Sequence, residues 1–367
     1  MLAEREIAGF VFPFIVGAMA ATMPSSPFLI SSAAPAAVSL ILAIIPISLL
    51  LHPYHQRWSR HIIIILLLTS SLGCGLLTGF THDLYSISSA YDHQSLSDLA
   101  VQLGEHLKTG IDKVPFKNTA TNHIISALIT GDRTGIPHET ISIFRESGAS
   151  HILALSGLHL GIIYGVISWL LSFLGHSLRA NRFRAFLIIS SCGIYTIITG
   201  AGPSITRALI FILIREISQL HNRYTSTAQV LMSSLFIQLL ISPGAIRDIG
   251  FQLSYAAMAG IAFIFPWFKS MWPKSKAGLM KWIWTSASMS LSCQITTGPI
   301  AYFYFGTFPQ HFLLTNLIAM PLTGLIIPSS LLTLALDSAG ICPEFMIWIT
   351  ENLVSLMTEA LAIVSSM

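Results

Sequence analysis

The sequence of 367 residues has few charged side chains and few cysteines. Only 10% of its residues are Asp, Glu, Lys or Arg, whereas soluble domains average about 25%. The length alone would allow two or three soluble domains, but this scarcity of charge excludes them. The four cysteines, Cys74, Cys192, Cys293 and Cys342, are scattered through apolar segments without metal-ligand spacing or a disulfide pattern. We therefore interpret them as small buried hydrophobic residues.

Motifs of common enzymes are also missing. The sequence has no GxGxxG, GxxxxGK[ST], HExxH or GxSxG, and its histidine-rich stretches lack the carboxylates of a metal site. We expect no catalytic residue, no cofactor and no metal, so the protein is not predicted to be an enzyme. Without a nucleotide fold, any energy input has to come from a partner protein or from a membrane gradient.

Long apolar runs fill most of the chain. With 53% hydrophobic residues and a mean hydropathy of +0.72, the composition is that of a polytopic membrane protein. The predicted fold class is an all-α integral membrane protein of about eleven transmembrane helices, some of them broken, with a short helical periplasmic insertion. The predicted spans are Gly9–Ile30, Pro35–Leu51, Ile62–Phe80, Ser150–Leu174, Phe186–Thr199, Ile205–Leu220, Thr227–Ile241, Gly250–Phe268, Trp282–Phe305, Phe312–Leu336 and Phe345–Val364.

Basic residues indicate how these spans are oriented. By the positive-inside rule the loops that carry them are cytoplasmic. This places the amino terminus inside, without a cleavage site for a signal peptide, and it places residues 81–148 and the carboxyl terminus outside. Only Arg247 lies in a loop on the other side. The inside residues are Arg57, Arg60, Arg179, Arg182, Arg184, Arg215, Arg223, Lys269, Lys274, Lys276 and Lys281.

Three regions follow from this pattern: a three-span anchor (1–80), a polar and mainly helical periplasmic segment (81–148), and a membrane core (149–367). The polar segment has eight acidic and five basic residues, which argues against a patch for duplex DNA. Ser95 and Asp98 resemble a capping box. The stripe of apolar residues that follows suits a helix on the membrane surface or one packed against protein. It consists of Leu96, Leu99, Leu103, Leu107, Ile111 and Val114.

The stretch Ser126–Gly165 passes from this polar region directly into a span. Residues 131–135 (GDRTG) form a polar break that includes Asp132 and Arg133, and Gly148 is placed to end a short helix. Ser150 and His151 then begin the predicted span.

Two faces are predicted on that span. Gly157, Gly161 and Gly165 are four apart and form a ridge for close helix packing. Ser156 and His159 lie on roughly the opposite side. His159 is either a structural histidine bonded to backbone or a residue lining an aqueous path, and we favour the path because ionisable groups in spans usually face one.

Polar residues enter four other spans. Arg207 lies about one turn inside its span, where it either lines a path or reaches the interface. Asp248, Gln252 and Tyr255 share one helical face. Asp248 caps that helix at least, and on the functional reading it also pairs with Arg207 or Arg247.

Two adjacent spans contain prolines together with an amide. Gln294 lies before Pro299, and Asn316 lies before Pro321 and Pro328. We predict that these two spans are broken and line a cavity, because freed backbone groups need protein or water as partners. Proline-kinked structural helices are the alternative.

Three of these stretches resemble one family. The segment GDRTGIP with FRESGASHILALSGLHLGI, the segment DIGFQLSY at residues 248–255, and the segment NLIAMPL at residues 316–322 occur in this order. Together they resemble the hallmark blocks of the ComEC-type competence proteins, over the membrane core only.

The resemblance implies a bacterial inner-membrane, multi-pass channel that passes single-stranded DNA into the cytoplasm during transformation. The implied partners are single-stranded DNA and the lipid bilayer, with a DNA receptor, a cytoplasmic translocation motor, a separate nuclease and a homo-oligomer left open. A path with few acids suits an anion, and aromatic side chains could stack bases or form an interfacial belt. These are Tyr255, Tyr302, Tyr304 and Phe305.

Two alternatives remain. One is an intramembrane enzyme that acts on a lipid with His159 and Asp248 as acid and base, and the other is a small-anion transporter, although no inverted repeat is visible. The sequence also departs from fuller family members. Residues 81–126 are too short and too helical for an oligonucleotide-binding barrel, and no metallo-β-lactamase-like motif follows the last span. We therefore expect no nuclease activity in this chain.

Overall fold

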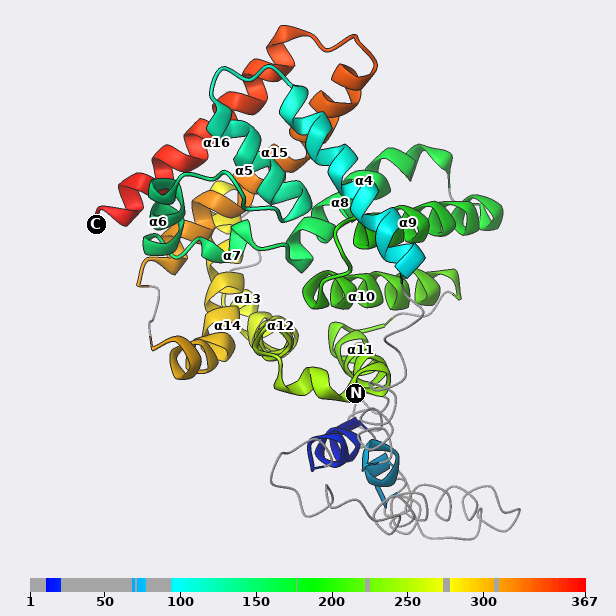
Figure 1. Ribbon diagram of the computed structural model, residues 1–367. Helices are drawn as coiled ribbons and strands as arrows, with labels where there is room; N and C mark the ends of the chain where they lie inside the picture. Colours follow the sequence, from blue (N-terminus) through cyan, green and yellow to red (C-terminus); the bar gives the residue numbers. More distant parts are fainter. Residues whose placement is uncertain are drawn as a thin grey trace. The chain divides into compact units, whose positions relative to one another are not determined.

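The computed structural model describes residues 11–20, 68–69, 71–76, 94–175, 177–221, 225–272, 278–306 and 310–367, and for 94–101 only the backbone. Within these ranges all regular structure is helical (Figure 1). The predicted all-α class is thereby confirmed. Apart from helix Val11–Ala20 and residues 68–69 and 71–76, the first three predicted spans lie outside the described residues. At the capping box predicted at Ser95 only the backbone is described, and it is helical.

The helices follow one another along the chain with short connections, and they keep the labels of Figure 1. η4 and η5 are 3₁₀ helices and η6 is a π-helix. The elements are α4 (Gln94–Lys113), α5 (Thr119–Thr130), α6 (His138–Glu146), α7 (Ser150–Leu153), α8 (Gly157–Leu170), η4 (Leu171–Leu174), α9 (Leu178–Ile198), α10 (Pro203–Leu220), α11 (Thr227–Ile241), η5 (Pro243–Arg247), α12 (Ile249–Ala259), η6 (Gly260–Ile264), α13 (Phe265–Ser270), α14 (Leu279–Phe305), α15 (Phe312–Ser338) and α16 (Glu344–Ser365).

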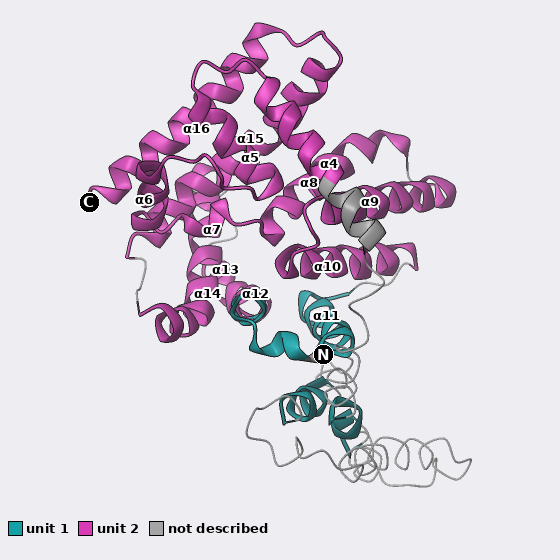
Figure 2. Ribbon diagram, in the orientation of Figure 1, with its two compact units in different colours: residues 1–94, 225–255 teal, residues 95–224, 256–367 magenta. Residues whose placement is uncertain are grey.

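The chain divides into two compact units (Figure 2). Unit 1 comprises residues 1–94 and 225–255, and unit 2 comprises residues 95–224 and 256–367. In unit 2, α8, α9 and α10 pack against one another, while α15 packs against α16, α14, α8 and α5. The division into an anchor (1–80), a periplasmic segment (81–148) and a membrane core (149–367) stays a prediction.

Among the described residues, four helical segments are long and apolar enough to cross a membrane: Gly157–Leu174, Ile249–Ser270, Phe312–Ser338 and Glu344–Ser365. Val11–Ala20 and Thr227–Ile241 are shorter apolar helices. These segments support a membrane protein, and the total of about eleven spans stays a prediction.

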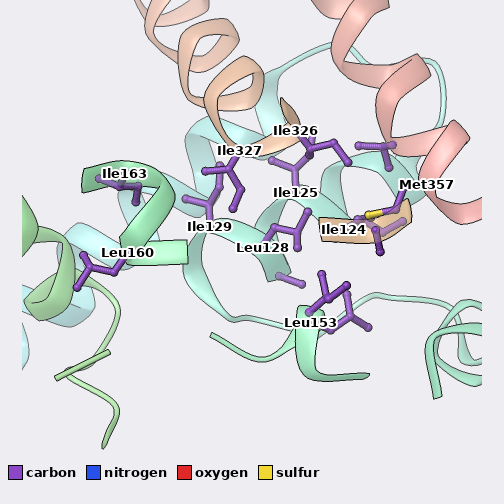
Figure 3. Close-up of a cluster of buried hydrophobic side chains, with 14 of the residues drawn as sticks. Ile124, Ile125, Leu128, Ile129, Leu153, Leu160, Ile163, Ile326, Ile327 and Met357 are labelled. Atoms are coloured by element: carbon purple, nitrogen blue, oxygen red, sulfur yellow. The ribbon is translucent and has the colours of Figure 1, made fainter. Parts of the chain in front are cut away.

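A hydrophobic core joins the polar segment to the membrane helices within unit 2 (Figure 3). α5 contributes a fully buried face, although it lies in the region predicted to be polar. Partners from α7, α8, α15 and α16 complete the core, so α5 is an integral part of the helical unit. The labelled members are Ile124, Ile125, Leu128, Ile129, Leu153, Leu160, Ile163, Ile326, Ile327 and Met357.

The predicted breaks at the prolines of α14 and α15 are wrong. α14 continues through Pro299, and α15 continues through Pro321 and Pro328, each as one helix of 27 residues. A proline removes only one backbone hydrogen bond, and the remaining bonds of a long helix persist. Beside Pro299, the Thr297 hydroxyl donates to the Cys293 carbonyl at 2.8 Å and supplies a further local bond.

An irregular turn occurs instead between α12 and α13. Residues 260–264 form a π-helix, η6, directly before Pro266. A Cβ atom at Gly260 would lie 2.3 Å from the Ser292 carbonyl oxygen of α14. This backbone contact requires glycine, and it packs η6 onto α14.

Candidate functional site

The loop after α5 is built by glycine and an aspartate. Gly131 ends α5 in the left-handed region at φ 81°, and a Cβ atom there would lie 2.4 Å from Leu155 Cδ1. Asp132 then accepts hydrogen bonds on Oδ1 from the Thr134 amide at 2.8 Å and from its hydroxyl at 2.6 Å. This aspartate turn sets the direction of the chain after α5.

Asp132 also forms an ion pair with Lys108 of α4. Lys108 Nζ in addition donates to the Thr134 hydroxyl at 3.2 Å. The hydrogen bond from Lys108 and those from Thr134 lower the pKa of Asp132 to about 2, and the same carboxylate raises the pKa of Lys108. The loop is thereby fixed to α4, which the sequence separates from it by more than twenty residues.

Arg133 connects this loop to the start of the membrane core. Its Nε donates to the Leu153 carbonyl at 3.1 Å, at the end of the short helix α7 that begins with Ser150. The His151 ring nitrogen Nδ1 lies 3.1 Å from the Gly148 carbonyl, and the side chain is exposed. The predicted signature loop is therefore a set of local contacts that positions α7.

The predicted fourth span begins later than Ser150. Ala154 and Ser156 are extended, so α7 ends before them and the candidate span starts at Gly157. The Ser156 hydroxyl accepts from the Leu158 amide at 3.3 Å, and His159 Nδ1 accepts from the Ser156 amide at 3.2 Å. A reciprocal capping box with histidine in the place usually held by Glu or Gln begins α8.

His159 is fully buried, with 0% of its side chain exposed. Its Nε2 atom has no hydrogen bond of ordinary geometry among the described residues. The bond between His159 Nδ1 and the Ser156 amide agrees with the first of the two roles considered for His159, a structural histidine bonded to backbone. Its role in lining a path stays a prediction.

The predicted glycine ridge packs closely at one position only within the described residues. A Cβ atom on Gly157 would lie 3.3 Å from Ala208 Cβ of α10, whereas one on Gly161 or Gly165 would meet nothing within 4 Å. Gly161 and Gly165 are exposed. Close packing at these two glycines is therefore not found in the described part of the chain.

Arg207 lies in the second turn of α10 and is 2% exposed. A buried guanidinium is costly unless polar groups surround it. Its burial in α10, which lies in the predicted membrane core, makes it the strongest functional candidate among the predicted path residues.

The second polar group, formed by Asp248, Gln252 and Tyr255, lies in unit 1. Asp248 caps α12, because its carboxylate accepts from the Phe251 amide at 3.1 Å, and it forms no ion pair with Arg247 in the described structure. Gln252 Nε2 donates to the Ile246 carbonyl at 3.0 Å. Tyr255 is buried, and its hydroxyl donates to Gln238 of α11 at 3.0 Å. The capping role of Asp248 is confirmed. Arg207 belongs to unit 2, so its pairing with Asp248 stays a prediction.

Asn316 and Gln294 lie on neighbouring helices of unit 2. Asn316 Oδ1 is buried and has no hydrogen bond among the described residues. Beside it, the Thr315 hydroxyl donates to the Ser147 carbonyl and joins α15 to the end of α6. Gln294 is half-buried on α14. Asn316 therefore places a buried acceptor atom inside the helical unit.

One buried pair was not predicted from the sequence. The Tyr164 hydroxyl on α8 donates to Glu216 Oε1 on α10 at 2.8 Å, and Arg215 lies over the Tyr164 ring at 5.9 Å. A signal was present, because Glu216 and Asp248 are the only acids between Glu146 and Asp337. Periodicity alone could not show which helix faces Glu216.

Among the described residues, no group of three or more His, Cys, Asp and Glu side chains could hold a metal ion. His159 and Asp248 each cap a helix and lie in different units. The described part of unit 2 thus presents positioned charges and amides within a helical unit.

Comparison with known proteins adds the family. The model of the family described as "Competence protein" matches residues 128–367. "ComE operon protein 3" of Bacillus subtilis (strain 168) is 26% identical over 205 residues, which is 56% of this chain and 24% of that protein. "Uncharacterized protein YcaI" of Escherichia coli (strain K12) is 25% identical over 249 residues, 66% of this chain and 32% of that protein. The matches thus span about a quarter and a third of these relatives, and no solved structure matches.

Proposed function

The chain belongs to the competence protein family, and from this membership we propose that it serves in DNA uptake during competence, as a membrane passage for the entering single strand. The observation that carries the proposal is the family match over residues 128–367, which includes α8, α10 and α15 with their buried polar side chains. The resemblance of three separate sequence blocks in the right order supports it.

Electrostatics favour an anionic solute for this passage. Only two acids occur between Glu146 and Asp337, against eleven Lys and Arg residues. One of the acids, Glu216, is buried, and one of the bases, Arg207, is buried in α10. A phosphate chain meets less repulsion in such an environment than in one rich in carboxylates. His159, Ser156, Arg207, Gln294 and Asn316 are the path residues that we propose in unit 2.

Aromatic side chains at the end of α14 offer a surface for bases. Tyr302, Phe303, Tyr304 and Phe305 are between 42% and 83% exposed. Stacking on such rings is tolerant of base sequence. Tyr255 is excluded from this role in its present position, because it is buried against Gln238.

The proposal places the protein in the bacterial inner membrane with about eleven spans, a cytoplasmic amino terminus and a periplasmic carboxyl terminus. Residues 81–148 then lie in the periplasm, where a DNA receptor would approach. A cytoplasmic translocation motor, a separate nuclease and further copies of this chain are the other proposed partners. We propose a passage in preference to the lipid-enzyme alternative, because His159 and Asp248, its acid and base, each use an acceptor atom in a helix cap.

The test is deletion of the gene in a transformable host, followed by addition of labelled duplex DNA. We expect DNA to bind the cell surface as before and internalised label to be lost. Complementation with Tyr302→Ala/Tyr304→Ala should restore uptake only in part, whereas Phe345→Ala, which removes an exposed ring of α16, should restore it fully. Undiminished internalisation in the deletion strain would exclude the proposed function.

A further inference from the structure

A small polar cavity lies in unit 2 between the first turns of α9 and the last turns of α10. Its volume is about 140 Å³, large enough for several water molecules or a small polar group. The proposed DNA passage makes no use of this cavity. The lining residues are Asn181, Arg184, Glu216, Gln219 and Leu220.

Glu216 is the buried charge of this cavity. Its side chain is 4% exposed, and Oε1 accepts the hydrogen bond from Tyr164 at 2.8 Å. No Lys or Arg nitrogen lies within 4.0 Å of the carboxylate in the described structure. A buried carboxylate with one neutral hydrogen bond retains acceptor capacity, and burial without further partners is costly. The cavity therefore offers a place for a cationic donor.

The opposite charge is supplied by α9. Arg184 is half-buried and presents a planar set of donors that suits a phosphate. Asn181 lies three residues before it on the same helical face, and Gln219 adds a second amide from α10. An acceptor for a cation and donors for an anion thus line one cavity. A ligand that carries an ammonium group close to a phosphate matches both.

Exposed apolar side chains occur on the same two helices as the cavity. Leu178, Phe183 and Phe186 on α9 are 67%, 53% and 65% exposed, and Ile217 on α10 is 50% exposed. In a membrane protein such side chains contact acyl chains, and aromatic rings are enriched at the level of the headgroups. The basic residues that begin α9, Arg179, Arg182 and Arg184, are typical of the cytoplasmic interface.

We propose that this cavity binds the phosphoethanolamine headgroup of a membrane lipid. The ammonium group donates to Glu216, the phosphate accepts from Arg184, and the acyl chains lie along the exposed apolar residues of α9 and α10. The bound lipid bridges α9 and α10 and supplies Glu216 with a cationic partner, which none of the described residues provides. The inference concerns lipid binding and does not depend on DNA passage.

Native mass spectrometry of the purified full chain in detergent tests the proposal. Lipids with identical acyl chains and three headgroups are compared: phosphoethanolamine, phosphocholine and phosphoglycerol. Phosphocholine cannot donate a hydrogen bond to Glu216, and phosphoglycerol lacks the cation. Since neither lipid can form a hydrogen-bonded ion pair with Glu216, we expect the phosphoethanolamine lipid to bind roughly tenfold or more tightly than either. Equal binding of all three would overturn the proposal.

Variants with matched controls assign the site. Glu216→Gln keeps an acceptor for Tyr164 and therefore the fold, and Arg184→Gln removes the phosphate donor. Each should reduce the preference for phosphoethanolamine by about tenfold. Glu359→Gln on α16 and Arg182→Gln on α9 remove an exposed charge of the same kind outside the cavity, and they should leave the preference unchanged. If Glu216→Gln and Arg184→Gln both kept the wild-type preference for the phosphoethanolamine lipid, the cavity would not be its binding site.

Soluble glycerophosphoethanolamine distinguishes the two sources of the headgroup. If the lipid is the ligand, the soluble compound should compete only weakly, because it lacks acyl chains to contact α9 and α10. If soluble glycerophosphoethanolamine competed at the same concentration as the lipid, the ligand would be a soluble phosphoethanolamine compound and not a membrane lipid.

Discussion

At the scale of single residues, the capping box of α8 gives His159 a defined task. His159 Nδ1 accepts a hydrogen bond from the Ser156 amide, and the Ser156 hydroxyl accepts one from the Leu158 amide. Loss of an N-cap interaction costs about 0.5–2 kcal/mol. We predict that His159→Ala lowers the amount of folded protein and its melting temperature in detergent.

His159→Gln is the informative companion variant, because Gln is a usual partner in a capping box. It should recover most of the stability that His159→Ala loses, whereas DNA uptake per folded molecule should fall in both variants, because neither side chain replaces the imidazole that we propose in the path. Normal uptake per folded molecule in both variants would leave His159 with the capping role alone. Membrane level and uptake are to be measured in the same strain. A stable, abundant His159→Gln protein without uptake would show that the imidazole itself lines the path.

The ion pair between Lys108 and Asp132 predicts a pH dependence. The pKa of Asp132 in the folded protein, about 2, lies below its ordinary value of 3.8. The pair therefore stabilises the folded state fully above about pH 4, and its contribution is lost as the pH falls from 4 towards 2. Both side chains are partly exposed, so the contribution is small, about 0.2–1 kcal/mol.

Asp132→Asn measures this contribution through the melting temperature in detergent. The variant should be slightly less stable than the wild type at pH 7, and the difference should vanish near pH 2. Ser142→Ala, which changes an exposed hydroxyl of α6, is a control that should show no such convergence. A constant difference from pH 7 to pH 2.5 would contradict a role for the charge.

At the scale of helices, the contact of Gly260 with α14 decides how η6 packs. A Cβ atom there would lie 2.3 Å from a backbone oxygen, which cannot move without its helix. Gly260→Ala should therefore destabilise the protein by about 1–3 kcal/mol. Gly324→Ala on α15, where a Cβ atom meets nothing within 4 Å, should be neutral or stabilising, since alanine favours helices by up to about 1 kcal/mol.

Fluorescence-detected size-exclusion chromatography after heating would compare these two variants. The same thermal stability for both would mean that η6 is not packed against α14 in the membrane. A more stable Gly324→Ala with a less stable Gly260→Ala is the expected result.

Helices also show why the predicted breaks were placed wrongly. Pro299, Pro321 and Pro328 indicated interruption from sequence, yet 27-residue helices absorb each of them. The irregularities occur instead at Ala154–Ser156 and at η6, which ends two residues before Pro266. A capping side chain or a close packing contact decided these positions.

At the scale of the whole molecule, the orientation in the membrane is the principal prediction. In a variant without the four native cysteines, Glu139→Cys on α6 should react with a membrane-impermeant maleimide added to intact spheroplasts. Ser270→Cys at the end of α13 should react only after the membrane is made permeable. The side chains of Glu139 and Ser270 are both exposed in the structure. The opposite pattern would invert the topology.

The sequence by itself determined the helical membrane class, the family and most helix boundaries. α11 begins and ends at the predicted residues, and α15 and α16 lie within two residues of the predicted spans. Apolar runs and caps are local properties, and a helix satisfies its backbone hydrogen bonds within its own segment, which is why local sequence sufficed.

Only the tertiary structure decided which side chains meet. The bond from Tyr164 to Glu216, the ion pair of Lys108 with Asp132, and the contact of Thr315 with Ser147 join residues 52, 24 and 168 positions apart. The periodicity of one helix gives the faces of that helix but not the neighbour of each face. That choice depends on how all helices of a unit pack at once, so the polar cavity of α9 and α10 could not be found from the sequence.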